Sequence, residues 1–274
     1  MKIAYSGVPG AFAHIAAKRI FPEEELVSFR DFDEAYRSVE EGDCEYAVLP
    51  IENSYAGEVG QVLDIAFNGN LFVNCVYQLK ITQNLLGVKG ATVESIKKVV
   101  SHPQALAQCE NYIKRHGFEK EDETNTARAA RNVAKEGDIT VAAIASSETA
   151  EIYGLEIIEA GINESKFNTT RFAVFSKEES AVMSADTVMN FLLMFTVKHE
   201  AGALVKAISE IGESGFNMRS LHSRPMKELP WSYYFYIEAE GDVTGEKGKA
   251  MLERLGNQCD MLKCLGTYLG DREI

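Results

Sequence analysis

The sequence has few basic residues and lacks the patterns that several classes of protein need. It contains 28 lysine and arginine residues against 41 aspartate and glutamate residues, a net charge of −13 at pH 7. Nucleic acids and anionic membranes bind clustered lysine and arginine, so we expect no nucleic acid and no membrane as partners. No apolar run approaches the roughly 20 residues that a membrane-spanning helix needs. An anionic small molecule would have to meet a local positive charge within a negative overall field.

The cysteines indicate neither a disulfide framework nor a metal site. There are five, an odd number, and they are scattered and lack the CxxC or histidine-rich spacing of zinc sites. We therefore expect reduced thiols, no metal and no cofactor. The first residues, Met1-Lys2-Ile3-Ala4-Tyr5, do not begin a targeting segment with a basic start, an apolar core and a cleavage site. The expected location is the cytoplasm.

The chain is long enough for two domains, because 274 residues of which 46% are apolar can form two ordinary cores. From residue 1 to about residue 175, short apolar strands alternate with amphipathic helices, which predicts an α/β fold with a mainly parallel sheet. The expected strands are 2–5, 26–29, 47–49, 96–100, 141–144, 156–158 and 172–175, and the expected helices are 13–20, 32–40, 59–67, 104–116, 126–136 and 148–153.

Residues 71–86 depart from this alternation, because they form a long, extended and partly alternating run. Such a segment can cross from one lobe to another, and the chain returns through residues 156–158. Two crossings predict a hinged cleft between two doubly wound lobes, as in type II periplasmic binding proteins. We place this domain at 1–178, with the first lobe at 1–76 and 155–178 and the second at 77–154.

The C-terminal part has a different order of elements. A linker is expected at 179–187, where small, acidic and apolar residues follow no clear period. Strands at 189–197, 218–224, 232–238 and 261–267 and helices at 202–213 and 245–256 give the order βαββαβ. This order predicts a ferredoxin-like domain over residues 188–274.

Two hydroxyl groups and a guanidinium stand together in Asn168-Thr169-Thr170-Arg171-Phe172, at the entrance to an apolar strand. An arginine fork can pair with a carboxylate through two parallel hydrogen bonds, and a neighbouring hydroxyl can donate to the same ligand. The alternative is an ordinary loop in which Asn and Thr cap backbone groups and Arg171 is solvated.

Three further segments place polar residues between a strand and a helix, where open α/β sheets bind ligands. Each one alone is also explained by turn geometry, but four such segments in one chain suggest one cleft. They are Ser6-Gly7-Val8-Pro9-Gly10-Ala11-Phe12, Pro50-Ile51-Glu52-Asn53-Ser54 and Ser101-His102-Pro103-Gln104-Ala105.

These motifs, in this order, together with Ala145-Ser146, Tyr153-Gly154-Leu155 and Thr170-Arg171-Phe172, closely resemble prephenate dehydratase. Gly202-Ala203-Leu204-Val205 and Ser223-Arg224-Pro225 resemble the phenylalanine-sensing ACT domain of that family, so the resemblance covers nearly the whole chain. It implies the loss of water and carbon dioxide from prephenate to give phenylpyruvate, and L-phenylalanine as an allosteric effector. No chorismate mutase domain is expected, so the enzyme would be monofunctional.

The resemblance also implies roles for individual residues. Thr170 and Arg171 would be catalytic, the arginine clamping a carboxylate and the threonine donating to the leaving oxygen. Glu52 is either the proton source or a carboxylate that holds backbone groups. The implied substrate-binding residues are Glu52, Asn53, Ser54, Phe172, Asn168, Gly10, Ala11, His102 and Ser146. The implied effector-binding residues are Gly202, Ala203, Leu204, Val205, Ser223 and Arg224.

Two departures from the family pattern leave alternatives open. The first loop lacks the family's acidic and hydroxyl groups and, as Gly-Val-Pro-Gly-Ala, is similar to arogenate dehydratases, so arogenate is the alternative substrate. In the ACT motif His222 replaces the usual glutamate, which would alter the affinity for phenylalanine. A non-catalytic amino-acid or anion sensor is the alternative of another class. ACT domains pair edge to edge, so a homodimer or homotetramer is expected.

Overall fold

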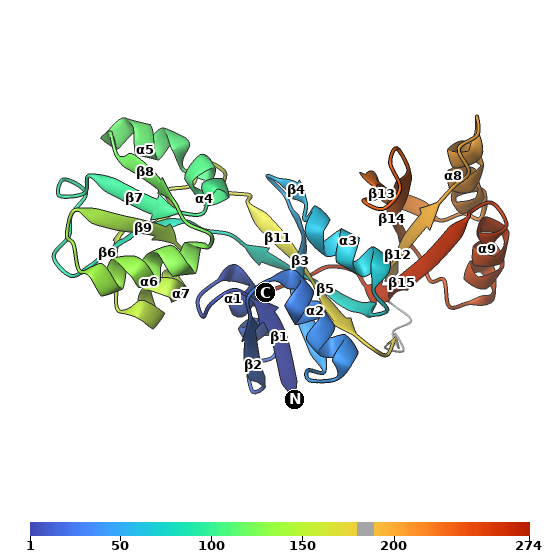
Figure 1. Ribbon diagram of the computed structural model, residues 1–274, viewed down its shortest axis with the longest axis horizontal. Helices are drawn as coiled ribbons and strands as arrows, with labels where there is room; N and C mark the ends of the chain where they lie inside the picture. Colours follow the sequence, from blue (N-terminus) through green and yellow to red (C-terminus); the bar gives the residue numbers. More distant parts are fainter. Residues whose placement is uncertain (180–188) are drawn as a thin grey trace. The chain divides into compact units, whose positions relative to one another are not determined.

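The computed structural model describes residues 1–179 and 189–274, and the expected linker lies almost entirely outside the described residues (Figure 1). The chain divides into two compact units. The first comprises Met1–Val59, Tyr77–Phe172 and Glu273–Ile274, and the second comprises Gly60–Val76 and Ala173–Arg272. Within the described ranges, no helix is long and apolar enough to cross a membrane.

The first lobe of the first unit is built on parallel strands β1 (Lys2–Ser6), β2 (Glu25–Phe29) and β3 (Tyr46–Asn53). Helices α1 (Phe12–Ile20) and α2 (Phe32–Glu41) connect them, as the alternation of strands and helices predicts. The whole sheet also contains β4 (Gly57–Glu58), β5 (Phe72–Lys80), β11 (Thr169–Ser176) and β16 (Arg272–Glu273), in the order β16-β5-β11-β3-β1-β2 with β4 on β3.

The second lobe has a five-stranded sheet in the order β10-β6-β9-β7-β8. Its strands are β6 (Asn84–Gly87), β7 (Lys98–Ser101), β8 (Glu119–Asp122), β9 (Val141–Ala145) and β10 (Glu156–Glu159). Its helices are α4 (Pro103–Gln108), α5 (Glu110–His116), α6 (Thr126–Glu136) and α7 (Ser147–Tyr153). The expected bilobed α/β arrangement is confirmed.

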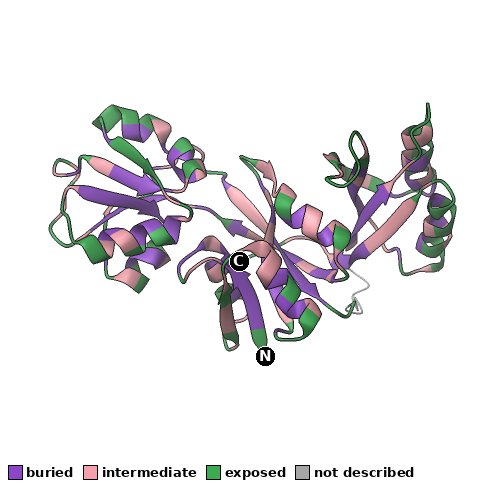
Figure 2. Cartoon of the chain, in the orientation of Figure 1, coloured by how far each residue is buried: buried purple, intermediate pink, exposed green. Residues whose placement is uncertain are grey.

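Alternate residues of β9 enter the two cores of this second lobe. Ala142 and Ile144 pack in a cluster with residues of α4 and α5, whereas Ala143 and Ala145 pack in a cluster with α6. Successive side chains of a strand point to opposite faces, so helices cover both faces of this sheet. Figure 2 accordingly shows a buried central sheet and exposed outer sides of the helices.

The sequence expectations miss two features of this lobe. The predicted helix 104–116 is divided at Cys109, which ends α4 and begins α5 with φ −114° and ψ 15°. This turn keeps the Cys109 side chain fully buried in the core. Strand β8 consists of Glu119-Lys120-Glu121-Asp122, all exposed, so no hydrophobic pattern marks it; charged residues are common on edge strands.

The second unit contains the expected ferredoxin-like fold. Strands β12 (Met189–Thr196), β13 (Asn217–Pro225), β14 (Tyr233–Glu240) and β15 (Met261–Leu269) form an antiparallel sheet in the order β13-β14-β12-β15. Helices α8 (Ala203–Glu213) and α9 (Glu246–Gly256) cover one face, where they share a core with the sheet (Figure 1). Helix α3 (Gly60–Asn68) also belongs to this unit, although it was expected in the first lobe.

Candidate active site

Strands β3 and β11 bring two of the predicted motifs together. The backbone N–H of Ser54 donates to the carbonyl of Thr169 at 2.9 Å, and the Thr169 N–H donates to Ser54 Oγ at 3.0 Å. Ser54 Oγ in turn donates to the carbonyl of Phe167 at 3.1 Å. The end of β3, with Asn53, therefore lies beside the start of β11, with Thr170 and Arg171.

The side chain of Asn53 is fixed in one orientation. Its Oδ1 accepts hydrogen bonds from the backbone N–H groups of Tyr55 and Ala56, each at 3.0 Å, so the other end of the amide must be the donor. Nδ2 donates to Thr170 Oγ1 at 3.0 Å. Because the Thr170 oxygen accepts this bond, its own hydrogen is directed to another acceptor.

Arg171 is paired with Glu52 on the opposite face of the same two strands. Arg171 Nη1 lies 2.9 Å from Glu52 Oε2, and the exposed fractions of the two side chains are 14% and 36%. Glu52 therefore pairs with the guanidinium of Arg171. One of the roles expected for Glu52 from the sequence was a carboxylate that holds backbone groups. Alternation along each strand explains the arrangement, because Asn53 and Thr170 share one face and Glu52 and Arg171 the other.

A row of buried amide side chains extends from Asn53 into the second lobe. Asn53 Nδ2 also donates to Asn168 Oδ1 at 2.8 Å, and Asn168 Nδ2 donates to Gln108 Oε1 at 2.9 Å. Gln83 Nε2 lies 3.5 Å from the same Gln108 oxygen. All four side chains are buried, so these groups are screened from competing water.

Gln83 and Gln108 were not predicted as site residues. Gln83 follows β5 at the first crossing, and its carbonyl accepts from the Ile162 N–H at 2.9 Å. Gln108 ends α4 on the face that also carries buried Ala105 and Leu106. A glutamine on the apolar face of a helix was the available sequence signal, since a buried amide needs polar partners.

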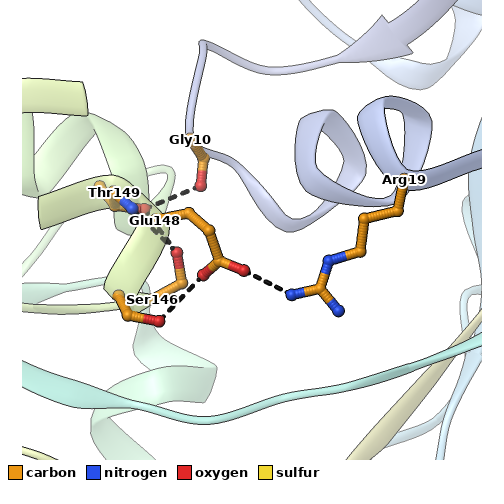
Figure 3. Close-up of polar contacts among 6 residues, drawn as sticks. Gly10, Arg19, Ser146, Glu148 and Thr149 are labelled. Carbon is orange, nitrogen blue, oxygen red and sulfur yellow. Dashed lines mark hydrogen bonds and ion pairs between the residues drawn. The ribbon is translucent and has the colours of Figure 1, made fainter. Parts of the chain in front are cut away.

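The first loop of the chain is bound to the second lobe (Figure 3). The carbonyl of Gly10 accepts a hydrogen bond from Thr149 Oγ1 at 2.9 Å. Arg19 Nη2 on α1 lies 2.6 Å from Glu148 Oε1 on α7. The Tyr153 hydroxyl donates to the carbonyl of Pro9 at 2.7 Å. These contacts join the two lobes at the loop that contains Gly10.

The backbone of this loop has a conformation that requires glycine at position 10. Gly10 has φ +89°, a backbone conformation that residues with a side chain rarely adopt. Its N–H donates to His14 Nδ1 at 3.2 Å. Ala11, which is almost fully buried, precedes α1 as the N-cap and its N–H donates to the Val8 carbonyl at 3.0 Å. Residues 7–11 carry no polar side chain, as the sequence indicates, and the N–H groups of Gly10 and Ala11 are paired within the chain.

Two predicted site residues cap helices. His102 Nδ1 accepts from the Gln104 N–H at 3.2 Å at the start of α4. Ser146 is buried at the start of α7, where its Oγ accepts from the Thr149 N–H at 3.2 Å (Figure 3). Both side chains therefore satisfy backbone N–H groups at the starts of helices.

Burial favours the uncharged form of two histidines near the site. Burial lowers the pKa of His14, and Lys18 adds to the effect. Burial also lowers the pKa of His102, although Asp122 opposes this shift. Arg171 is always protonated, so it supplies positive charge where these imidazoles do not. Phe172, next to it, is fully buried and packs in the core.

Among residues 1–179 and 189–274, no group of three or more His, Cys, Asp or Glu side chains is arranged to hold a metal ion.

The predicted effector residues lie in the second unit. Gly202 is the N-cap of α8 with φ +84°, and a side chain at this position would have no atom within 4 Å. Ala203, Leu204 and Val205 form the first turn of α8, and Val205 is exposed. Ser223 is exposed on β13, whereas the guanidinium of Arg224 is bound to Asp64.

Comparisons with known proteins match this chain consistently to one family. A protein-family model described as prephenate dehydratase matches residues 3–180. A bifunctional chorismate mutase/prephenate dehydratase of Neisseria gonorrhoeae is 36% identical over 271 residues, which are 98% of this chain and 74% of that protein. Arogenate dehydratase/prephenate dehydratase 2, chloroplastic, of Arabidopsis thaliana is 32% identical over 277 residues, covering 98% of this chain and 72% of that protein.

Solved structures share the fold. One described as "GqqA- a novel type of quorum quenching acylases" is 29% identical with a TM-score of 0.88, and the match covers 98% of both chains. Prephenate dehydratase in complex with L-Phe from Arthrobacter aurescens is 24% identical with a TM-score of 0.90, covering 98% of this chain and 90% of that one.

Proposed function

The chain belongs to the prephenate dehydratase family, and from this premise we propose how its own residues convert prephenate to phenylpyruvate. The protein is a carbon–oxygen lyase of phenylalanine biosynthesis. In this reaction the ring carboxylate leaves as carbon dioxide, and the electron pair of the broken carbon–carbon bond enters the ring. The ring hydroxyl takes up a proton and leaves as water. Aromatisation provides the driving force, so the protein must orient the substrate and stabilise the leaving group.

Thr170 is the residue that hydrogen-bonds the leaving hydroxyl. The observation that carries this assignment is the 3.0 Å bond from Asn53 Nδ2 to Thr170 Oγ1. Since the threonine oxygen already accepts, its hydrogen donates to the substrate oxygen and polarises the carbon–oxygen bond. The orientation is set before substrate arrives, because the Asn53 amide is itself fixed by the N–H groups of Tyr55 and Ala56.

Arg171 binds a substrate carboxylate that reaches past the ends of β3 and β11, because its side chain leaves the strand on the face opposite to Thr170. A guanidinium can form two parallel hydrogen bonds to a carboxylate while a third donor keeps its bond to Glu52. Glu52 is then a positioning residue that holds the guanidinium in place rather than a proton source. The partly buried position of Arg171 strengthens its attraction for an anion compared with a fully solvated arginine.

The other substrate-site assignments are supported by position. Ser54 lies at the end of β3 beside Thr169, and Asn168 links Asn53 to Gln108. We assign Gly10 and Ala11 to the wall of the site formed by the first loop, and Phe172 supports the site from the core. We assign His102 and Ser146 to the edge of the site, where they cap α4 and α7.

L-Phenylalanine is the effector of the ferredoxin-like unit. The first-turn N–H groups of α8 lack intrahelical partners and favour a carboxylate, and open space around Gly202 leaves room for one. Leu204 and Val205 supply apolar surface, and Ser223 a hydroxyl. The Arthrobacter aurescens protein of the same fold holds L-Phe. Pairing of ferredoxin-like units gives a homodimer or a homotetramer.

A cytoplasmic location is supported by the thiols. All five cysteines are free, as is usual in a reducing compartment.

The test is product formation from prephenate and, separately, from arogenate, with and without phenylalanine. Phenylpyruvate from prephenate, suppressed by phenylalanine, supports the proposal. Phenylalanine formed from arogenate alone would keep the mechanism and change the substrate, an outcome that the arogenate dehydratase relatives make worth measuring. No turnover of either compound would mean that the cleft only binds ligand.

A further inference from the structure

Helix α3 is bound to the ferredoxin-like sheet through a partly buried carboxylate. Asp64, near the middle of α3, accepts from Arg224 Nε at 2.9 Å and from Arg224 Nη2 at 3.2 Å, which is a bidentate pair. The Tyr234 hydroxyl donates to the same carboxylate at 2.8 Å, and Lys227 Nζ lies 3.0 Å away. Asp64 therefore joins α3 to both β13 and β14.

The two ends of α3 are also held. Lys263 Nζ, from β15, donates to the carbonyl of Ala66 at 2.6 Å and to the carbonyl of Gly69. Such carbonyls at the end of a helix lack intrahelical partners and attract a cation. At the start of α3, a Cβ on Gly60 would lie 2.0 Å from Arg224 Nη1, so only glycine permits this approach.

Arg224 lies on the face of the sheet that is opposite to α8 and α9. It pairs in register with Tyr234, and the rings of Tyr234 and Phe67 on α3 stack with centroids 4.1 Å apart. Its neighbour Ser223 pairs with Phe235, which packs against the core formed with α8 and α9. Successive residues of β13 therefore point to opposite faces of the sheet. Ser223 lies on the face covered by α8, and Arg224 lies on the face toward α3.

The other end of this connection is the substrate site. β4 pairs with β3 so that Gly57 lies opposite Asn53 and Glu58 opposite Glu52. The Val59 N–H donates to the Ile51 carbonyl at 2.8 Å, and α3 begins with the next residue, Gly60. A shift of α3 must therefore act on the hairpin that fixes the Asn53 amide.

We propose that α3 is the link through which phenylalanine acts on the substrate site, with the Asp64–Arg224 pair as the point where the effector unit holds it. This inference rests on the proposed function. When phenylalanine binds beside β13, Arg224 moves with the strand and carries α3, and the β3–β4 hairpin follows. The donor position of Thr170 then changes through Asn53, so the effector lowers turnover without entering the substrate site.

The test is Asp64→Asn in the full chain, assayed with prephenate over a series of phenylalanine concentrations, with phenylalanine binding measured by calorimetry. Asparagine keeps the size of the side chain and removes its charge. We expect basal turnover within about twofold and retained phenylalanine binding, but half-inhibition at about tenfold more phenylalanine, within the usual range of allosteric coupling. Unchanged inhibition in Asp64→Asn would overturn the inference.

Asp33→Asn is the matched control, because it removes an exposed carboxylate on α2 that pairs with Arg37 at 2.9 Å. It should leave inhibition unchanged. Lys263→Met is the second variant, which releases the other end of α3 and should weaken inhibition in the same direction even if Asp64→Asn fails to fold. Normal inhibition in Lys263→Met would count against the link.

Hydrogen exchange separates this inference from the proposed function. Phenylalanine should change the exchange of amides 60–68 in the unaltered protein and leave them unchanged in Asp64→Asn. This readout needs no turnover, so it decides the link even if prephenate is not the substrate. An identical response of these amides in both proteins would overturn the link while the activity assay stands. Absence of any phenylalanine binding would overturn the effector assignment and the link together.

Discussion

Asn53 Nδ2 lies 3.0 Å from Thr170 Oγ1, and two backbone N–H groups hold the other end of the same amide. The two residues are 117 positions apart in the sequence and meet because β3 and β11 are neighbours. This bond keeps the Thr170 hydrogen pointing away from Asn53. The catalytic assignment therefore depends on an amide group that can donate at this position.

Asn53→Asp should lower kcat with prephenate by about 10²- to 10³-fold, because a carboxylate would accept from Thr170 and turn its hydrogen away from the substrate. The measurement is steady-state kinetics with circular dichroism to verify folding. Asn111→Asp makes the same change on an exposed face of α5 and should leave kcat unaltered. A kcat for Asn53→Asp close to that of the unaltered enzyme would remove Asn53 from the mechanism.

Arg171→Lys should raise KM for prephenate by about tenfold or more, because a lysine ammonium cannot bind a carboxylate bidentately while keeping a bond to Glu52. The measurement is KM and kcat from initial rates. The control is Arg37→Lys, an exposed arginine that pairs with Asp33. Equal KM values for Arg171→Lys and the unaltered enzyme would show that another group binds the carboxylate.

Gly10→Ala should lower the free energy of unfolding more than Gly137→Ala. Both glycines have positive φ, +89° and +72°, so each substitution adds about 1 kcal/mol of backbone strain. A Cβ on Gly10 would also lie 3.2 Å from Thr149 Oγ1, whereas a Cβ on Gly137 would meet nothing within 4 Å. Urea denaturation should give a further loss of about 1 kcal/mol for Gly10→Ala, with reduced activity. Equal losses would mean that the loop has room to move away from α7.

Asp64 should contribute stability that depends on pH. Burial raises the pKa of Asp64, but hydrogen bonds from Arg224, Tyr234 and Lys227 outweigh it, so the net pKa is below the ordinary 3.8. A carboxyl group with a lowered pKa stabilises the fold above its unfolded pKa, and this contribution is lost as the pH falls through the folded pKa. Asp64→Asn, which does not titrate, should be about 1–3 kcal/mol less stable than the unaltered protein at neutral pH.

Urea denaturation at several pH values measures this contribution. The difference between the two proteins should be constant from neutral pH down to about pH 5 and should shrink below the ordinary pKa of Asp64. A difference that stays the same in acid would mean that the carboxylate charge does not hold α3.

The elements with clear sequence boundaries were predicted well. Helix α6 was expected at 126–136 and is found there, because Asn125 caps its start and Gly137, with φ +72°, ends it. The all-charged strand β8 and the turn at Cys109 have no such pattern, so they could not be predicted from periodicity. Tertiary pairing, rather than local preference, decides both.

The candidate site was predicted in part. The sequence identified Asn53, Thr170 and Arg171 as site residues, and the pairing of β3 with β11 brings them together. It did not indicate Gln108, whose partner Asn168 is 60 positions away, or the Asp64–Arg224 pair, which spans 160 positions. Side chains this distant become neighbours only through the fold, and no local spacing indicates which partners they meet.

The most direct test of the central claim is the rate of phenylpyruvate formation from prephenate by Thr170→Val, compared with the unaltered enzyme in a single turnover. Valine keeps the shape of the side chain and removes the hydroxyl. Thr169→Val is the control on the neighbouring residue, which serves β3 through its backbone carbonyl. We expect Thr170→Val to be slower by about 10²- to 10⁴-fold and Thr169→Val to be nearly normal. A normal rate for Thr170→Val would contradict the assignment of the hydroxyl as the donor to the leaving group.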